Sequence, residues 1–397
     1  MNDDEMMVQG FRFSAVSAGL RKKPGLDLAL IFSDQDTTTA AGMFTTNRVK
    51  AAPVQLDQER VRTGAARAII ANAGNANACS GREGMEAARR SAEILAASVG
   101  LKPEEVLVAS TGVIGQVLPL SRIEKALPEL IGGLDPRGAP KAAEAIMTTD
   151  SFPKLSRFTG EAGGKPFTIL GMAKGAGMIM PDMATMLCFV VTDLRIETLA
   201  LRSALRAAVQ KTFNRITVDG DTSTNDTVLI LANGLAGNGP LGETGELAFR
   251  AGLTEVLGEL AEMIVRDGEG ASKLVHIRVK GAVDEGQALL AARTVANSPL
   301  VKTAFYGQDP NWGRIMAALG RSGVIMQEER VDIWVDDVQI VAAGLGLGAE
   351  AEARAAEKMH EKSFDVMVDL HMGRAEERVS TCDLTHQYVS INADYRT

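Results

Sequence analysis

Short runs of β-branched and apolar residues recur along the chain and predict buried strands. Gly, Asn, Asp or Pro flanks each run, and these residues commonly end regular secondary structure. The predicted strands are Leu26–Phe32, Arg67–Asn72, Glu105–Ala109, Leu187–Thr192, Thr227–Ala232, Val275–Val279, Val331–Val335 and Phe364–Leu370.

Three segments between these runs have helical periodicity. Met85–Val99 is rich in alanine, and the segments Ile196–Phe213 and Leu253–Ile264 place apolar residues three and four positions apart. That spacing gives a helix one apolar stripe, which packs against a core. Because strands and helices alternate irregularly, the pattern predicts an α/β protein built in layers rather than a simple strand–helix–strand series.

Composition narrows the class of protein. Hydrophobic residues make up 46% and charged residues 23% of the 397 residues, which is typical of a globular protein and excludes a disordered or fibrous chain. The length suffices for two or three domains, although no linker or repeat marks a boundary between them. The net charge of −8 provides no overall basic field for nucleic acid or an anionic membrane surface.

The cysteines, histidines and first residues bear on location and metal chemistry. Three cysteines without a pairing pattern fit a reducing compartment. The acidic N-terminal segment lacks the apolar stretch of a secretory signal, and no apolar run approaches the length of a membrane helix. The four histidines occur singly, without the spacing of metal ligands. We therefore expect a cytoplasmic protein without a metal site.

The most unusual stretch runs from Lys174 to Leu187, a glycine-rich segment that leads into a predicted strand. Taken alone, it is a loop entering the core. Thr185 gives it a second interpretation, because a threonine at an N-terminus has its own α-amine as a base, and that amine titrates near pH 7.7–8.0. This chemistry would require the chain to cut itself between Ala184 and Thr185.

The segment AKGAGMIMPDMATMLCF resembles the self-cleavage signature of the ornithine acetyltransferase family, the glutamate N-acetyltransferases of arginine biosynthesis. Further segments resemble the family in the same order over essentially the whole chain, so chance similarity is excluded. They are TTNRVKAAPV (45–54), NAGNANACSG (72–81), STGVIG (110–115), TTDSFPK (148–154), TVDGDTSTND (217–226), DGEGASKL (267–274), DPNWGRI (309–315) and YVSINADYRT (388–397).

The resemblance implies an α/β fold of the self-processing N-terminal-nucleophile type, a layered α-β-β-α sandwich shared with aminopeptidases. It implies cleavage into an α chain of residues 1–184 and a β chain of residues 185–397, packed as one catalytic unit. Two copies of each chain would form a heterotetramer.

The resemblance also implies the roles of individual residues. Thr185 would be the nucleophile, with its α-amine as base, and Thr111 and Gly112 would form the oxyanion hole. By their types alone, Thr111 and Gly112 are a turn after a strand, and a single Lys or Glu is a surface charge. The implied substrate-binding residues are Thr148, Lys174, Thr185, Glu269, Asn392 and Thr397. The pattern YVSIN predicts a strand that holds the C-terminal residues in place.

The implied activity is transfer of the acetyl group of N2-acetyl-L-ornithine to L-glutamate, by a ping-pong mechanism through acetyl-Thr185. It needs small-molecule substrates but no metal or organic cofactor. The residues leave open whether acetyl-CoA is also a donor and whether the activity is regulated. They also leave open an aminopeptidase or amide hydrolase, which would use the same threonine but pass the acyl group to water.

Other motifs indicate other chemistry less strongly. Gly344–Ala349 satisfies the dinucleotide-binding pattern and suggests an oxidoreductase, but fewer than fifty residues follow it, too few for the rest of such a sheet. Asp219–Asp226 is rich in calcium-type ligands but lacks the EF-hand glutamate, so we expect a turn-rich loop near the active site. Gly160–Lys165 is one residue short of a P-loop. Cys79 and Cys188 are expected to be buried packing residues.

Overall fold

The computed structural model describes residues 3–180 and 186–394. The chain forms two compact units. Unit 1 comprises Met1–Gly175, Asp182–Asn214 and Asp221–Ile264, and unit 2 comprises Ala176–Pro181, Arg215–Gly220 and Val265–Thr397. Each unit therefore contains residues from both sides of the predicted cleavage point.

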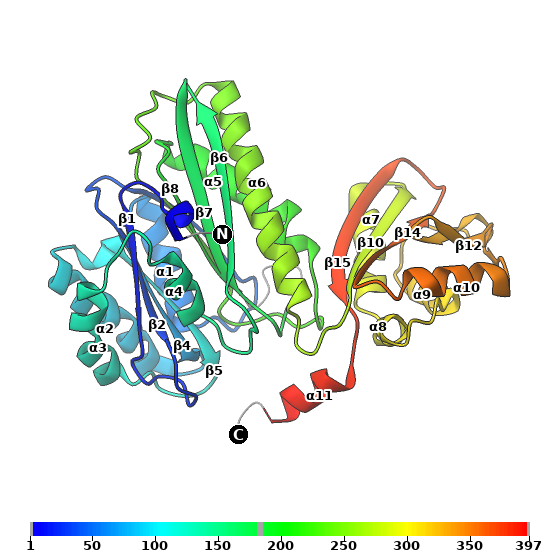
Figure 1. The fold of residues 1–397 in the computed structure, drawn as a ribbon, viewed down its shortest axis with the longest axis horizontal. Helices are drawn as coiled ribbons and strands as arrows, with labels where there is room; N and C mark the ends of the chain where they lie inside the picture. The colour runs from blue at the N-terminus through cyan, green and yellow to red at the C-terminus, as the bar shows by residue number, and fades with distance from the viewer. Residues whose placement is uncertain (1–2, 181–185, 395–397) are drawn as a thin grey trace. The chain divides into compact units, whose positions relative to one another are not determined.

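Unit 1 contains two sheets (Figure 1). Its strands are β1 (Phe11–Val16), β2 (Leu28–Ser33), β3 (Thr39–Phe44), β4 (Ala68–Asn75), β5 (Val106–Val113), β6 (Lys154–Ala162), β7 (Lys165–Lys174), β8 (Leu187–Thr192) and β9 (Thr227–Ala232). Its helices are α1 (Ala52–Arg60), α2 (Gly81–Val99), α3 (Leu120–Gly132), α4 (Ala139–Ala145), α5 (Thr198–Lys211) and α6 (Glu243–Arg266), whose last two residues extend into unit 2. Within the described residues, the strand orders are β1-β2-β4-β5 and β3-β9-β8-β7-β6.

The two sheets of unit 1 pack face to face. Because side chains alternate along a strand, one face of β8 contributes Leu187, Phe189 and Val191 to a core shared with β1, β2, β4 and β5. On the outer side of the first sheet, α2 and α3 bury their apolar stripes against β2, β4 and β5. On the outer side of the second, α6 lies so close to Gly171 of β7 that a Cβ there would be 2.7 Å from the side chain of Val256. The predicted α-β-β-α sandwich is confirmed.

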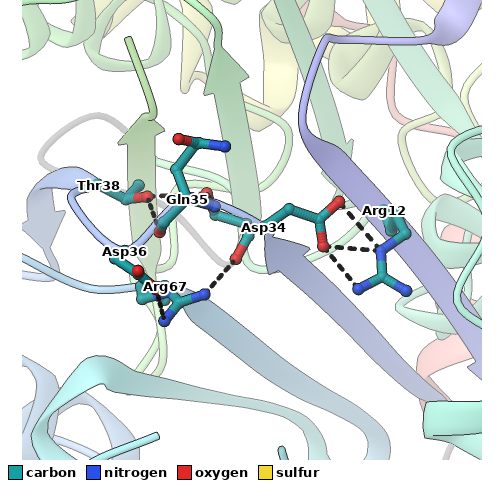
Figure 2. Close-up of polar contacts among 7 residues, drawn as sticks. Arg12, Asp34, Gln35, Asp36, Thr38 and Arg67 are labelled. Atoms are coloured by element: carbon teal, nitrogen blue, oxygen red, sulfur yellow. Dashed lines mark hydrogen bonds and ion pairs between the residues drawn. The ribbon is translucent and has the colours of Figure 1, made fainter. Parts of the chain in front are cut away.

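The connection from β2 to β3 shows how polar side chains hold a surface turn of unit 1. Arg12 on β1 forms a two-pronged ion pair with Asp34, its Nη2 lying 2.6 Å from Oδ1, and Arg67 lies 2.8 Å from Asp36 (Figure 2). Thr38 donates its hydroxyl hydrogen to the carbonyl of Gln35. Both ion pairs are partly exposed, so each contributes little to stability.

Unit 2 is a sheet with helices packed on it. Its strands are β10 (Leu274–Ala282), β11 (Asp332–Val335), β12 (Val338–Ala342), β13 (Leu345–Gly346), β14 (Ser363–Asp369) and β15 (Ala375–Cys382). Its helices are α7 (Glu285–Ala296), α8 (Pro299–Tyr306), α9 (Trp312–Gly320), α10 (Ala349–Lys358) and α11 (His386–Ala393). The order in the described chain is β13-β12-β11-β14-β10-β15. One core joins the sheet to α7, α8, α9 and α10.

The predicted strands and helices are confirmed, with bounds that mostly shift by a few residues; α6 is the exception, because it begins at Glu243, well before the predicted start at Leu253. The prediction of a strand at YVSIN is wrong, because these residues belong to α11. Thr385 caps this helix by accepting a hydrogen bond from the backbone N–H of Gln387. None of the helices in the described ranges is both long and apolar enough to cross a membrane.

Candidate functional site

Thr148 and Lys174, for which the family resemblance implies a role in substrate binding, lie in direct contact. The ammonium group of Lys174 donates a hydrogen bond of 2.7 Å to Oγ1 of Thr148. Lys174 is the last residue of β7 and is only 2% exposed, and Thr148 lies three residues after the end of α4. The fold therefore brings together two residues that are 26 positions apart.

A buried carboxylate, Asp150, holds this pair in place. It accepts hydrogen bonds from the backbone N–H of Thr148 at 3.0 Å and of Gly175 at 2.7 Å. It also lies 2.8 Å from Nζ of Lys154 and 3.7 Å from Nζ of Lys174. Burial alone would raise the pKa of Asp150, but the two ammonium groups and the hydrogen bonds outweigh it and lower that pKa. Asp150 is therefore a fixed negative charge beside Lys174.

The sequence analysis missed Asp150 and Lys154, although both lie in the segment TTDSFPK. Their spacing of four residues is common in exposed ion pairs and carries no sign of burial. In the structure both side chains have no exposed surface. Such a pair needs good geometry to be tolerated, because desolvation of two charges is costly.

The candidate oxyanion residues lie at the end of β5, which is an edge strand. Two side chains of α1 cover the start of that edge. Arg60 donates to the carbonyl oxygen of Val106 at 2.5 Å, and the carboxyl group of Asp57 accepts from the N–H of Val108 at 3.1 Å. Burial raises the pKa of Asp57 well above its ordinary value, since only this N–H and Arg60 favour its charge.

A third side chain covers the next position of the edge. Nδ2 of Asn225 donates to the carbonyl oxygens of Ser110 at 2.7 Å and Ala76 at 2.6 Å. Side chains from outside β5 thus bind the backbone groups of its even-numbered residues Val106, Val108 and Ser110. The last of these residues directly precedes Thr111 and Gly112. These backbone bonds fix the strand that carries the candidate oxyanion donors.

Gly112 occupies a position that only glycine fits. Its φ is +133°, and a Cβ would lie 2.3 Å from the carbonyl carbon of Gly74. The pairing of β4 with β5 is irregular at this point, where Gly74 lies opposite Gly112. The preceding residue, Thr111, is 3% exposed. The chain therefore departs from regular β geometry at the position where the family resemblance implies hydrogen-bond donors for a reacting carbonyl.

The candidate nucleophile Thr185 and the cleavage residue Ala184 lie outside the described residues. Their neighbour Met186 is described and is buried. Its N–H donates a hydrogen bond of 3.2 Å to Oδ1 of Asp226, and its carbonyl accepts from the N–H of Thr227. Burial raises the pKa of Asp226 well above its ordinary value.

Unit 2 brings together two other candidate residues. Nδ2 of Asn392 in α11 donates a hydrogen bond of 2.8 Å to Oε2 of Glu269. The Glu269 carboxyl group packs against Gly177, where a Cβ would lie 2.5 Å from its Cδ. The remaining candidate, Thr397, lies outside the described residues.

The competing motifs form ordinary turns. Gly344–Ala349 contains a hairpin from β12 to β13, not the direct strand-to-helix turn that binds dinucleotides. Gly160–Lys165 is the hairpin between β6 and β7. The carboxyl group of Asp219 accepts from the N–H groups of Met178 and Ile179. Across the part of the chain that the structure describes, no cluster of three or more metal-ligating side chains occurs.

Cys79 and Cys188, both predicted to be buried, differ in exposure. Cys188 is fully buried, as predicted, and burial raises the pKa of its thiol. The prediction that Cys79 is buried is wrong: it is exposed, with φ of +55°, in the turn before α2. The small side chains around Cys79 in the sequence suggested a position inside the core, but the turn points this residue outward.

Comparison with known proteins connects this site to a family. The family model described as "ArgJ family" matches residues 12–397. The chain is 54% identical to the arginine biosynthesis bifunctional protein ArgJ of Geobacter sulfurreducens, over 99% of this chain and 100% of that protein. It is 51% identical to the protein of the same name from Desulfotalea psychrophila, with the same coverage.

A solved structure is also similar. The crystal structure of arginine biosynthesis bifunctional protein ArgJ from Bacillus halodurans is 42% identical, with a TM-score of 0.50. The match covers 52% of this chain and 98% of that chain. That chain is therefore about half as long as this one.

Proposed function

Because this chain belongs to the ArgJ family and is thereby an acetyltransferase of arginine biosynthesis, we propose that it transfers the acetyl group of N2-acetyl-L-ornithine to L-glutamate. The acetyl group is carried as an ester of Thr185. Both substrates are small molecules.

One connected set of hydrogen bonds carries the proposal. Asn225 holds the carbonyl of Ser110, next to the proposed oxyanion donors Thr111 and Gly112. The next residue, Asp226, holds the N–H of Met186, next to the proposed nucleophile. Two adjacent residues thereby tie the strand of the oxyanion donors to the residue that follows Thr185. This supports a shared role of the two segments in one reaction.

The proposed reaction begins with self-cleavage. Oγ1 of Thr185 attacks the carbonyl carbon of Ala184, the C–N bond breaks, and the amine nitrogen takes up the proton that the hydroxyl loses. Water then hydrolyses the resulting ester, leaving a carboxylate on Ala184 and a free α-amine and hydroxyl on Thr185. A free α-amine near its ordinary pKa is available as a base at neutral pH.

Acetyl transfer then proceeds in two half-reactions. Thr185 attacks the acetyl carbonyl of N2-acetylornithine, and its α-amine passes the hydroxyl proton to the departing ornithine amine. The α-amine of glutamate next attacks the acetyl ester, and its proton returns to the threonine hydroxyl. In both steps Thr111 and Gly112 donate hydrogen bonds to the oxyanion.

Substrate binding in this proposal uses both ends of an amino acid. Lys174, held by Thr148 and Asp150, pairs with a carboxylate, whereas Glu269, held by Asn392, faces an ammonium group. Thr397 completes the set. No metal or organic cofactor takes part.

The half-length crystal chain of the Bacillus halodurans relative supports a molecule made of two pieces. We propose residues 1–184 and 185–397 as these pieces, with two copies of each in a cytoplasmic heterotetramer. A native mass measurement paired with a denaturing one tests this composition.

The experiment that tests the function supplies N2-acetylornithine with and without glutamate. We expect one equivalent of ornithine per site without glutamate, and continuous turnover to N-acetylglutamate with it. A hydrolase would instead release acetate continuously at the same rate in both cases, and that result would refute the transferase. Replacing N2-acetylornithine by acetyl-CoA tests whether a second donor is used.

A further inference from the structure

Three neighbouring strands of unit 1 begin or end beside the proposed reaction centre. In the sheet β3-β9-β8-β7-β6, Leu187 of β8 lies opposite Lys174 of β7 on one side and Thr227 of β9 on the other. Met186 and Asp226 directly precede β8 and β9, and a hydrogen bond joins them. Asp226 therefore lies at the end of the sheet where the chain enters β8 from the proposed nucleophile.

The carboxyl group of Asp226 has one oxygen that is hydrogen-bonded and one that has no partner. Oδ1 accepts a hydrogen bond of 3.2 Å from the N–H of Met186. Oδ2 is buried, and among the described residues no hydrogen-bond partner lies within reach of it. The residue has no exposed surface. A negative charge on such an oxygen is strongly disfavoured, whereas an uncharged carboxyl group loses only the hydrogen bond of its O–H. The geometry thus indicates the protonated form.

Asp150 in the same unit is the opposite case. Burial tends to raise the pKa of Asp150, but two ammonium groups and the backbone N–H of Thr148 outweigh it and lower that pKa. At Asp226, burial raises the pKa of the carboxyl group well above its ordinary value, and neither the neighbouring hydrogen bonds nor the charge of Lys174 compensates. Two buried aspartates of one unit therefore carry different charges at neutral pH.

The charge of Asp226 bears on the proposed base. The backbone nitrogen of Thr185, which self-cleavage turns into the α-amine, is three covalent bonds from the nitrogen of Met186. Bond lengths of about 1.3–1.5 Å keep the two nitrogens within about 4.5 Å of each other, and Oδ1 of Asp226 lies 3.2 Å from the second one. A carboxylate less than about 8 Å from the amine would favour the ammonium form and lower the neutral fraction of the amine at pH 7 by about tenfold or more. An uncharged carboxyl group holds the backbone without this effect.

We propose that Asp226 is a positioning residue that works in its uncharged form: it holds the N–H of Met186 in place and leaves the α-amine of Thr185 free to act as a base at neutral pH. This inference rests on the proposed function, and it concerns a residue to which the family resemblance assigns no role. Exchange of aspartate for asparagine should therefore have opposite results at the two buried positions. At Asp226, asparagine keeps the acceptor oxygen and the absence of charge, whereas at Asp150 it removes a charge that holds Lys174.

Rates of ornithine release from N2-acetylornithine, measured per cleaved molecule, test the inference. D226N should react at close to the wild-type rate, and the pH at which its rate falls to half on the acidic side should not move. In D226A the N–H of Met186 loses its acceptor, so the rate should fall about 10-fold, as expected for loss of a buried hydrogen bond. D150N is the contrasting control and should bind N2-acetylornithine more weakly.

Three kinetic results would overturn the inference. A D226N protein as slow as D226A would show that the carboxyl group itself is required. An acidic half-point that moves to lower pH in D226N would show that the wild-type residue carries a charge. A D226A protein that keeps the wild-type rate would show that the bond to Met186 positions nothing.

Thermal melts give a second readout, which does not depend on activity. The pKa of Asp226 is higher in the folded protein than its value of about 3.9 in the unfolded chain, so the wild type should lose stability relative to D226N as the pH rises from about 4 to about 7. For Asp150 the sign is opposite, and the wild type should gain stability relative to D150N as the pH rises through the acidic range. A constant difference between wild type and D226N from pH 4 to pH 7 would contradict an uncharged Asp226.

A third measurement applies if D226N does not fold. The infrared difference spectrum between wild type and D226A at pH 7 should contain the C=O band of a protonated carboxyl group, which a carboxylate lacks, and absence of this band overturns the inference. Absence of any acetyl-enzyme in the wild type would instead overturn the proposed function, while the melts and the spectrum would still report the charge of Asp226.

Discussion

The substitution Asp150→Asn tests how the position of Lys174 is maintained. The side chain of Asp150 has no exposed surface and contacts two lysines and two backbone N–H groups at once. Asparagine keeps the shape but replaces one acceptor oxygen with an NH₂ group. That group would face either an ammonium or an N–H donor, so the variant loses both the charge and at least one hydrogen bond.

The size of the effect follows from the burial of the partners. Lys154 is also fully buried, and breaking a buried ion pair by removing one of its partners typically costs about 3–5 kcal/mol. Total stability of a folded domain is of the order of 5–15 kcal/mol. D150N should therefore lose a large part of the free energy of unfolding of unit 1, and its KM for N2-acetylornithine should rise because Lys174 is no longer fixed.

Urea unfolding at pH 7 measures the effect, with D34N as the matched control. Asp34 forms a closer ion pair, 2.6 Å from Arg12, but both side chains are more than one-third exposed (Figure 2). An exposed pair contributes at most about 1 kcal/mol. If D150N loses no more stability than D34N, the interpretation of Asp150 as a buried charge that organises the site is wrong.

The contribution of Asp150 to stability changes with pH in a definite direction. The pKa of Asp150 is lower in the folded protein than in the unfolded chain. The stabilisation by Asp150 is therefore fully present above its pKa in the unfolded chain, about 3.9, and is lost as the pH falls toward its lower pKa in the folded protein. The difference in unfolding free energy between wild type and D150N should stay constant from about pH 7 to pH 5 and shrink below pH 4.

Two further predictions concern the proposed reaction centre. G112A should lower the rate of acetyl transfer by about 100-fold or more, as loss of an oxyanion donor does, because the new Cβ would collide with the backbone of Gly74. Initial rates of a folded sample measure the loss, and activity near that of the wild type would contradict the prediction. D226A should slow self-cleavage at least about 10-fold, since the N–H of Met186 loses its acceptor. D193A is the control and should cleave normally, because Asp193, the residue after β8, accepts a similar hydrogen bond from the backbone N–H of Thr168. Equal cleavage rates of the two variants on a denaturing gel would show that Asp226 has no special role.

The sequence predicted the layers of the fold because apolar periodicity reports directly on burial. Leu187–Thr192 and Thr227–Ala232 are strands with the predicted bounds, since continuous apolar runs occur where both faces of a strand are covered. The last helix was predicted as a strand because YVSIN is rich in β-branched and aromatic residues. Local capping by Thr385 overrides that preference.

The supporting residues of the site could not be predicted from one sequence. In the sequence, Asp150 and Asp226 are ordinary polar residues of turn-rich segments. Only the folded chain shows that both are buried beside residues of the proposed site. The bond between Glu269 and Asn392 joins positions 123 residues apart. The resemblance named the candidate residues, whereas the structure shows which neighbours hold the described ones in place.

The most direct test of the account is the denaturing mass of the purified protein. The account predicts two polypeptides, residues 1–184 and residues 185–397, with threonine as the first residue of the second, and a single uncut chain for T185A. A wild-type protein that remains one full-length chain and still transfers acetyl groups at its full rate would contradict the proposed nucleophile.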